Sequence, residues 1–417
     1  MINLIFFSLS PFLILLLFRG LFPLYWLLGD EDGGKIHGPP VCVAQCICYA
    51  LIITVTCIVA FRKMQAWRET CKVNQSGAVM TEPQQSAIIP LLSLLSVAFV
   101  YVLTGTDTPL FMSGGSDAAM LVYMNSSTKG GAFAVDVLVL SLSVVIMPLV
   151  FLSRSTIGRF VLLLCCVLLA IHSGKKTGLV LLVGQIALII FGMGFRPGRA
   201  LVYCASLALI AGAFFSLQFL RTTLHYDNEI ALEDAVPAIA NMIYGSSTSL
   251  YEQMFTQNGV SLAVRYSDHL GSMPAMTYWA NSYTKILFGT GIDQSIGPFL
   301  SSELYGNMNP NGVNPTLPFE FIFVFGNYMA GWLGVALAIP IGILTIKLLS
   351  MTLDGSRKRD QTKVTLGLLG IWFMTAIFAD SLYAMRMTPV IPFVLCVLYF
   401  LRFLNRRKLS MFTSSRS

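Results

Sequence analysis

The basic residues of one long segment, about residues 220–317, are the first that could do chemistry, because this segment is otherwise acidic and rich in aromatic residues. It holds only three bases: Arg221, Arg265 and Lys285. A guanidinium stays charged and binds two oxygens at once, so the two arginines are candidates for recognition of a phosphate, with Tyr266 and His269 as neighbouring ligand contacts. The alternatives are that Arg221 anchors the apolar helix it follows and that Arg265 pairs with Asp268.

A second basic site is the turn between two apolar runs, His172-Ser173-Gly174-Lys175-Lys176-Thr177-Gly178. Lys175 and Lys176, with free backbone amides at the start of the next helix, predict an anion site. The alternative is a solvated turn whose lysines meet lipid headgroups.

The stretch 307–320 combines asparagines, prolines and a carboxylate. Its prolines and glycine exclude a regular helix before Pro318, whereas Pro318 suits the first turn of one. Glu320 then lies in the first turn of an apolar helix, where it acts as a general base, positions a ligand hydroxyl, or only interacts with the helix N-terminus. Asn314 is a further candidate ligand contact.

Asp380 and Arg386 flank the last predicted outer turn. Arg386 is a candidate anion contact, and an Asp380–Arg386 ion pair is the alternative. No phosphate-binding loop, dinucleotide glycine fingerprint, zinc-type Cys/His spacing or G-x-S-x-G motif occurs, and the four histidines are scattered. We therefore expect no metal and no cofactor.

The elements that must position these residues are membrane helices. The chain has 417 residues, of which 55% are hydrophobic and 11% charged, against about 25% charged in an average soluble domain. Apolar runs predict ten transmembrane spans: 3–27, 41–61, 86–104, 131–152, 160–173, 177–195, 200–219, 323–349, 364–382 and 389–404. The net charge of +7 does not indicate a nucleic-acid partner, because the bases lie in short clusters between these runs.

Most of the 27 Lys and Arg fall in one set of alternate loops, which predicts that both termini are cytoplasmic. The fold class is then an all-α polytopic membrane protein in three parts. Residues 1–219 form a seven-span bundle, residues 220–317 form a large outer loop with helices along the membrane surface (231–256 and 272–288), and residues 318–417 supply three spans and a basic tail.

The layout and motifs resemble a known family. Ten spans, a large outer loop before the last helices, Ser173-Gly174-Lys175-Lys176, and Glu320 six residues before Phe325-Gly326 look like the bacterial O-antigen (Wzy-type) polymerases. Arg265 followed by Phe288-Gly289-Thr290-Gly291 is similar to an element of the related ligases and polymerases, and Arg386 resembles the arginine they carry before the last span.

The resemblance implies a GT-C-like glycosyltransferase with its active site on the periplasmic face of the inner membrane. It would transfer a glycan from undecaprenyl pyrophosphate to a sugar hydroxyl of a new lipid-linked repeat unit, inverting the anomeric centre. Glu320 would be the base, Arg265 would stabilise the leaving pyrophosphate, and the other contacts would come from Arg221, Arg386, Lys175, Lys176, Tyr266, His269 and Asn314. A chain-length regulator of the polysaccharide co-polymerase type is the expected protein partner.

Two rival functions remain open. An O-antigen ligase shares these features, although the ligases have a histidine near the re-entry stretch where this chain has Asn311, Asn314 and Glu320. A transporter or flippase of lipid-linked glycans would be expected to show internal repeats and charged residues inside its spans. No repeat is visible, and Asp136 is nearly the only acid within a predicted span.

Overall fold

The structure is a computed structural model. It describes residues 39–73, 88–104, 131–153, 155–172, 259–280, 316–379 and 381–414, with isolated positions at 182, 184–186, 188–189, 212, 296, 299–300 and 303. Over these ranges the regular structure is entirely helical and no strand occurs, which confirms the helical class. The helices are α3 (Pro40–Val73), α4 (Ile88–Thr104), α6 (Gly131–Leu152), α7 (Thr156–His172), α11 (Gly259–Leu270), α14 (Leu317–Phe325), η3 (Tyr328–Ala330), α15 (Gly331–Arg357), α16 (Gln361–Ala379), α17 (Ser381–Arg386) and α18 (Val390–Ser414).

Several of these helices suit a membrane. Three described helical stretches are long and apolar enough to cross one, namely Pro40–Trp67, Tyr328–Arg357 and Gln361–Phe378, and four more are shorter but apolar. Large apolar side chains such as Leu51, Phe99 and Phe400 are exposed on the outer surfaces of α3, α4 and α18. Such surfaces are expected to face lipid tails rather than water.

Six predicted spans coincide with described helices: α3, α4, α6, α7, α16 and α18. The ends agree within a few residues except that α3 continues to Val73 and α18 to Ser414, beyond the predicted ends at 61 and 404. The prediction for 323–349 was wrong at its start. Gly326, in the left-handed conformation (φ 61°), ends α14, and α15 begins at Gly331. The span 3–27 and most of 177–195 and 200–219 lie outside the described residues.

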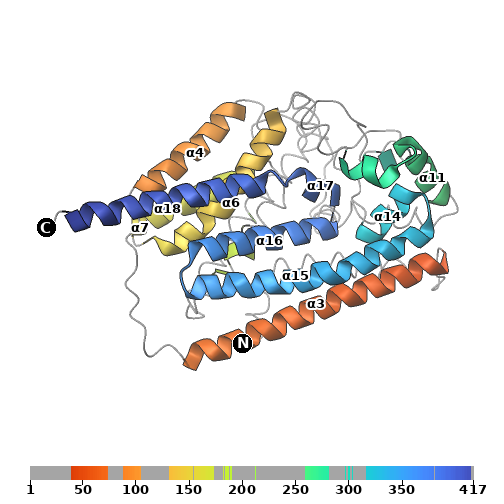
Figure 1. Cartoon of the computed structure of the whole chain (residues 1–417), viewed down its shortest axis with the longest axis horizontal. Coiled ribbons are helices and arrows are strands. Elements are labelled where there is room, and N and C mark those ends of the chain that lie inside the picture. The colour runs from red at the N-terminus through yellow and green to blue at the C-terminus, as the bar shows by residue number, and fades with distance from the viewer. Residues whose placement is uncertain are drawn as a thin grey trace, which may run out of the picture.

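Close approach at glycines packs the central helices. The Cβ of an alanine at Gly342 would lie 2.5 Å from the Thr56 hydroxyl of α3, and one at Gly367 of α16 would clash with the Thr352 hydroxyl of α15. Small residues at such positions let helix backbones approach closely, which is a principal source of packing energy where no hydrophobic effect operates. Helices α3, α15 and α16 accordingly run side by side (Figure 1).

The bundle has two chemically different ends. At the end drawn on the left of Figure 1, α3 and α15 finish and α16 begins, and the Arg357 guanidinium of α15 lies over the Trp67 ring of α3. At the other end α11 packs against α14, and α3 and α15 begin there. On α3, α15 and α16, the described bases that were predicted to be cytoplasmic lie toward the first end. The candidate site residue Glu320 lies at the second end.

Gly334 of α15 gives a test of this packing. A Cβ there would lie 2.7 Å from backbone atoms of Leu317 and Pro318, which cannot rotate away. We expect Gly334→Ala to destabilise the protein by about 1–3 kcal/mol through overpacking, measured as thermal unfolding in detergent. Gly212→Ala, whose Cβ would meet no described residue within 4 Å, is the matched control, and an equal effect of the two substitutions would contradict the described contact between α14 and α15.

Candidate functional site

Glu320 is the centre of a buried polar cluster. The residue is 1% exposed. Its Oε1 accepts hydrogen bonds from the Tyr278 hydroxyl and the Ser381 hydroxyl, both at 2.7 Å, and its Oε2 accepts one from the Ser381 backbone N–H at 3.1 Å. The Ser381 hydroxyl in turn accepts a hydrogen bond from Trp279 Nε1 at 2.8 Å. This cluster of Tyr278, Trp279, Glu320 and Ser381 is called the carboxylate cluster below.

Local backbone chemistry places Glu320 in the first turn of α14. Pro318 occupies the start of the helix, as the sequence predicted, and the Glu320 N–H donates to the Thr316 carbonyl. The helix ends after nine residues at Gly326, whose left-handed backbone costs a glycine little. A Cβ at Gly326 would lie 3.0 Å from the Ser267 Cβ and 3.3 Å from the Val264 Cα, so α11 also requires a glycine there.

Aromatic rings surround the carboxylate cluster. Trp279 lies 5.3 Å from Phe321 between ring centroids, and Tyr278 makes an edge contact with Tyr266 at 6.3 Å. Tyr266 is fully buried and also packs against Phe299 and Phe323. Tyr266 therefore packs in the hydrophobic core and presents no face to solvent. Its predicted contact with a ligand stays a prediction without structural support.

Arg265 occupies the opposite, exposed face of α11. Its Nη1 lies 2.7 Å from Glu303 Oε2, and the two side chains are 57% and 32% exposed. The described partner is thus Glu303 rather than the Asp268 that spacing had suggested. His269, one turn further along α11, is exposed as well. Arg265 and Glu320 therefore sit on adjoining helices, one at the surface and one buried, and each has its own partners.

Other predicted site residues fall outside what the structure describes. Arg221, Lys175, Lys176, Asn314 and Asp380 belong to this group. Arg386 ends α17, which begins at Ser381 of the carboxylate cluster, but its side chain is outside the described residues. His172, just before the two lysines, is buried, and its Nε2 lies 3.1 Å from the Thr104 hydroxyl.

Sequence reasoning missed Ser381 and Gln45. Ser381 directly follows Asp380 in the outer turn, and a signal was available there, because a serine beside an acid at the end of an apolar run is a candidate helix cap. Gln45 is the amide of α3 within an apolar run; it is 1% exposed, and its Nε2 donates to the Tyr328 carbonyl at 2.7 Å. Its Oε1 and the Thr316 hydroxyl are buried without a hydrogen-bond partner within the described chain.

The arrangement offers acid–base and hydrogen-bonding chemistry. Within the described ranges no three His, Cys, Asp or Glu side chains are grouped as metal ligands would be. Comparisons with protein-family models, with curated proteins and with solved structures found no match.

The hydrogen bonds of the carboxylate cluster predict that the loss of a single hydroxyl group lowers the stability of the protein. Tyr278→Phe removes one hydrogen bond from a buried charged acceptor, so we expect a loss of about 1.5–3 kcal/mol in the free energy of unfolding, measured in detergent. The control is Tyr399→Phe, because Tyr399 is 74% exposed on α18 and its loss should cost under about 0.5 kcal/mol. Equal stability of the two variants would show that the Tyr278 hydroxyl does not stabilise Glu320.

Proposed function

We propose that the chain is a membrane glycosyltransferase that polymerises undecaprenyl-pyrophosphate-linked repeat units into O-antigen or a related surface polysaccharide. The observation that carries the proposal is the carboxylate cluster, ringed by aromatic side chains, at the end of the bundle opposite the basic end. By the positive-inside rule the basic end is cytoplasmic, so the cluster faces the periplasm of the bacterial inner membrane. The proposal includes ten spans, a GT-C-like architecture and cytoplasmic termini.

In the proposed reaction Glu320 is the general base. The oxygen of the acceptor sugar hydroxyl bonds to the anomeric carbon of the donor glycan, the bond from that carbon to pyrophosphate breaks, and Glu320 takes the hydroxyl proton. Attack opposite the leaving group inverts the anomeric centre. In the described conformer the Ser381 hydroxyl donates to Glu320 Oε1, as an acceptor hydroxyl would, so the substrate has to displace it.

Arg265 stabilises the negative charge that grows on the leaving pyrophosphate. Its ion pair with Glu303 supports this role, because an exposed pair contributes only about 0–1 kcal/mol and is readily exchanged for a phosphate. We assign further contacts with pyrophosphate or glycan to Arg221, Arg386, Lys175, Lys176, His269 and Asn314. Tyr266 is assigned to packing behind Tyr278. A chain-length regulator is the proposed protein partner.

The ladder of glycan lengths tests the proposal. In a strain that lacks its own polymerase and makes a matching repeat unit, we expect the parent chain to restore the ladder and Arg265→Ala or Glu320→Gln to abolish it. Loss of one such contact typically costs about 3 kcal/mol, roughly a hundredfold in rate. Protein levels in the membrane are matched by immunoblot.

Arg402→Ala is the control, because Arg402 is an exposed base on α18, which runs toward the basic end. It should leave the ladder unchanged. Single-repeat glycan with the parent chain would overturn polymerisation and favour the ligase alternative, which uses the same donor and another acceptor. A ladder that survives Glu320→Gln would remove Glu320 as the base.

A further inference from the structure

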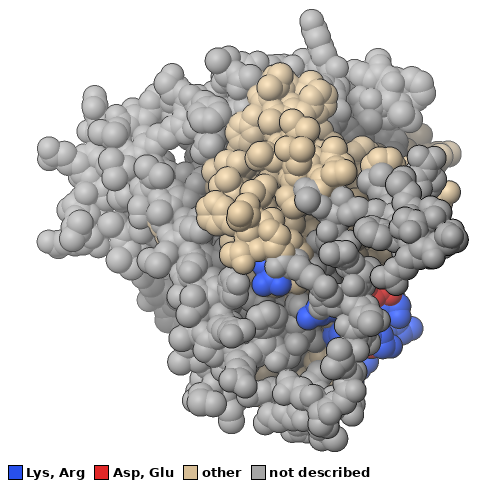
Figure 2. Space-filling model, turned by 90° about the vertical axis from the view of Figure 1, so that its left-hand side faces the viewer, with Lys and Arg blue, Asp and Glu red and all other residues tan. Residues whose placement is uncertain are grey.

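Six basic residues gather where α3 ends and α15 turns into α16. They are exposed on the surface: Arg62, Lys63, Arg357, Lys358, Arg359 and Lys363. Figure 2 views the molecule from this side, and among the charged atoms that it colours, blue clearly exceeds red. Only two acids, Asp354 and Asp360, lie in the same turn. These six bases and Trp67 are called the basic platform below.

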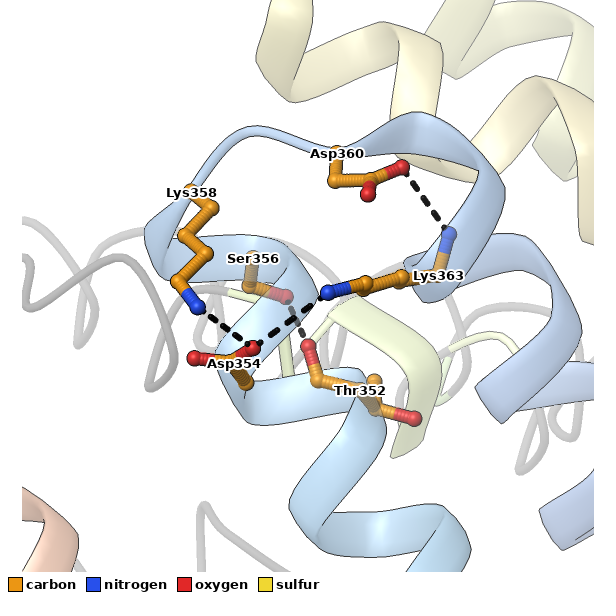
Figure 3. A network of polar contacts seen from close by, with 6 residues as sticks. All are labelled: Thr352, Asp354, Ser356, Lys358, Asp360 and Lys363. Carbon is orange, nitrogen blue, oxygen red and sulfur yellow. Dashed lines mark hydrogen bonds and ion pairs between the residues drawn. The ribbon is translucent and has the colours of Figure 1, made fainter.

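Both acids are engaged in shaping the turn. Asp354 Oδ2 lies 3.1 Å from the Lys358 Nζ and 3.7 Å from the Lys363 Nζ. Asp360 Oδ1 accepts a hydrogen bond from the Lys363 backbone N–H at 3.2 Å and so caps α16 (Figure 3). The turn is closed by Arg359, whose backbone is left-handed (φ 52°), and by the Asp360 N–H, which donates to the Gly355 carbonyl at 2.8 Å. The platform is therefore an ordered surface with an excess of positive charge.

A contact between side chains joins α3 to this turn. The Arg357 guanidinium carbon lies 5.7 Å from the centre of the Trp67 ring, a cation–π distance. The Arg62 and Lys63 positions are one turn of α3 before Trp67, so their charges belong to the same end as Arg357. No acid of α3 offsets them except Glu69, whose side chain lies outside the described residues.

The same end holds buried donors that have no acceptor among the described residues. Six buried side-chain polar atoms have no hydrogen-bond partner within the described chain, and three of them belong here: Trp67 Nε1, Gln361 Nε2 and Thr365 Oγ1. All three can donate a hydrogen bond. Of these residues, Trp67 is in contact with a platform base, Arg357. Buried polar groups are normally paired, so an anion with oxygen acceptors at this place would suit both the indole N–H and the guanidinium.

We propose that the basic platform binds the phosphate of an anionic phospholipid headgroup. The apolar run of α3 ends at Phe61, directly before Arg62 and Lys63, and that of α15 ends at Leu353, shortly before Arg357, which places the platform at headgroup depth. A phosphodiester offers the oxygens that the indole N–H and the guanidinium need, and basic clusters at the ends of membrane helices attract anionic lipids. This inference is independent of the proposed glycosyl transfer.

The test measures lipid binding to the purified, delipidated full-length chain. Phosphatidylglycerol is titrated against phosphatidylcholine, with bound lipid counted by native mass spectrometry and thermal unfolding followed in parallel. We expect the parent to prefer phosphatidylglycerol at least tenfold, with a preference that falls as salt rises. Each base near an anionic surface contributes about fivefold in affinity, so the triple variant Arg62→Gln, Lys63→Gln, Arg357→Gln should bind about a hundredfold more weakly.

A second variant and a matched control keep the test decisive. Trp67→Phe keeps a ring beneath Arg357 and removes only the indole donor, so it should lower the phosphatidylglycerol preference several-fold without unfolding the protein. Arg159→Gln with Arg402→Gln removes two exposed bases of α7 and α18 that lie outside the platform, so it should lower the preference much less than the triple variant does.

Several results would overturn the proposal. Equal affinity of the parent for both lipids would do so, and so would a loss in the control as large as in the triple variant. If the triple variant does not fold, an unchanged preference in Trp67→Phe decides against the headgroup contact. Displacement of the lipid by millimolar inorganic phosphate would show a site for a soluble anion instead.

Discussion

A carboxylate buried as deeply as that of Glu320 must be surrounded by hydrogen-bond donors, because an unpaired buried charge costs several kcal/mol. The donors here come from Tyr278 and Ser381, which are 42 and 61 residues away in sequence. Glu320 is therefore stable only if three parts of the chain are held in place together: the segment that carries Tyr278, α14 and α17. The Tyr49 hydroxyl, which donates to the Phe378 carbonyl at 3.2 Å, extends this dependence to α3 and the end of α16.

The same hydrogen bonds constrain how the site can act. In the proposed reaction Glu320 has to exchange one of its donors, Tyr278 or Ser381, for a substrate hydroxyl. Exchange of the Ser381 hydroxyl would still leave the Ser381 backbone N–H on Oε2, so the carboxylate would keep a donor from the same residue. Ser381 begins α17, at whose other end is Arg386. A movement of α17 that frees Glu320 would therefore also shift the position of Arg386, and in the proposed reaction this would couple proton transfer to the binding of the leaving group.

Hydropathy predicted where most described helices lie, because burial in lipid imposes a length and a composition that a single sequence displays. It did not predict the break at Gly326, since a left-handed glycine within Phe-Val-Phe-Gly-Asn does not lower the hydropathy of the run enough to divide it. Helix α11 was missed for the opposite reason, because its polar exposed face lowers its mean hydropathy while Tyr266 and Leu270 face the core. Glu320 was found because a carboxylate in an apolar helix is rare, whereas its partner Ser381 and the Arg265–Glu303 pair depend on contacts between distant segments, which local spacing does not encode.

The two ends of the bundle are linked through α15, which packs against α14 at Gly334, against α3 at Gly342 and against α16 opposite Gly367. These contacts involve backbone or short side chains, so α15 has little freedom to slide relative to its neighbours. The position of the basic end along the bundle then fixes the position of the carboxylate cluster at the other end. The proposed transfer between two lipid-linked molecules would require such a fixed height, because substrates held at the membrane surface cannot adjust theirs.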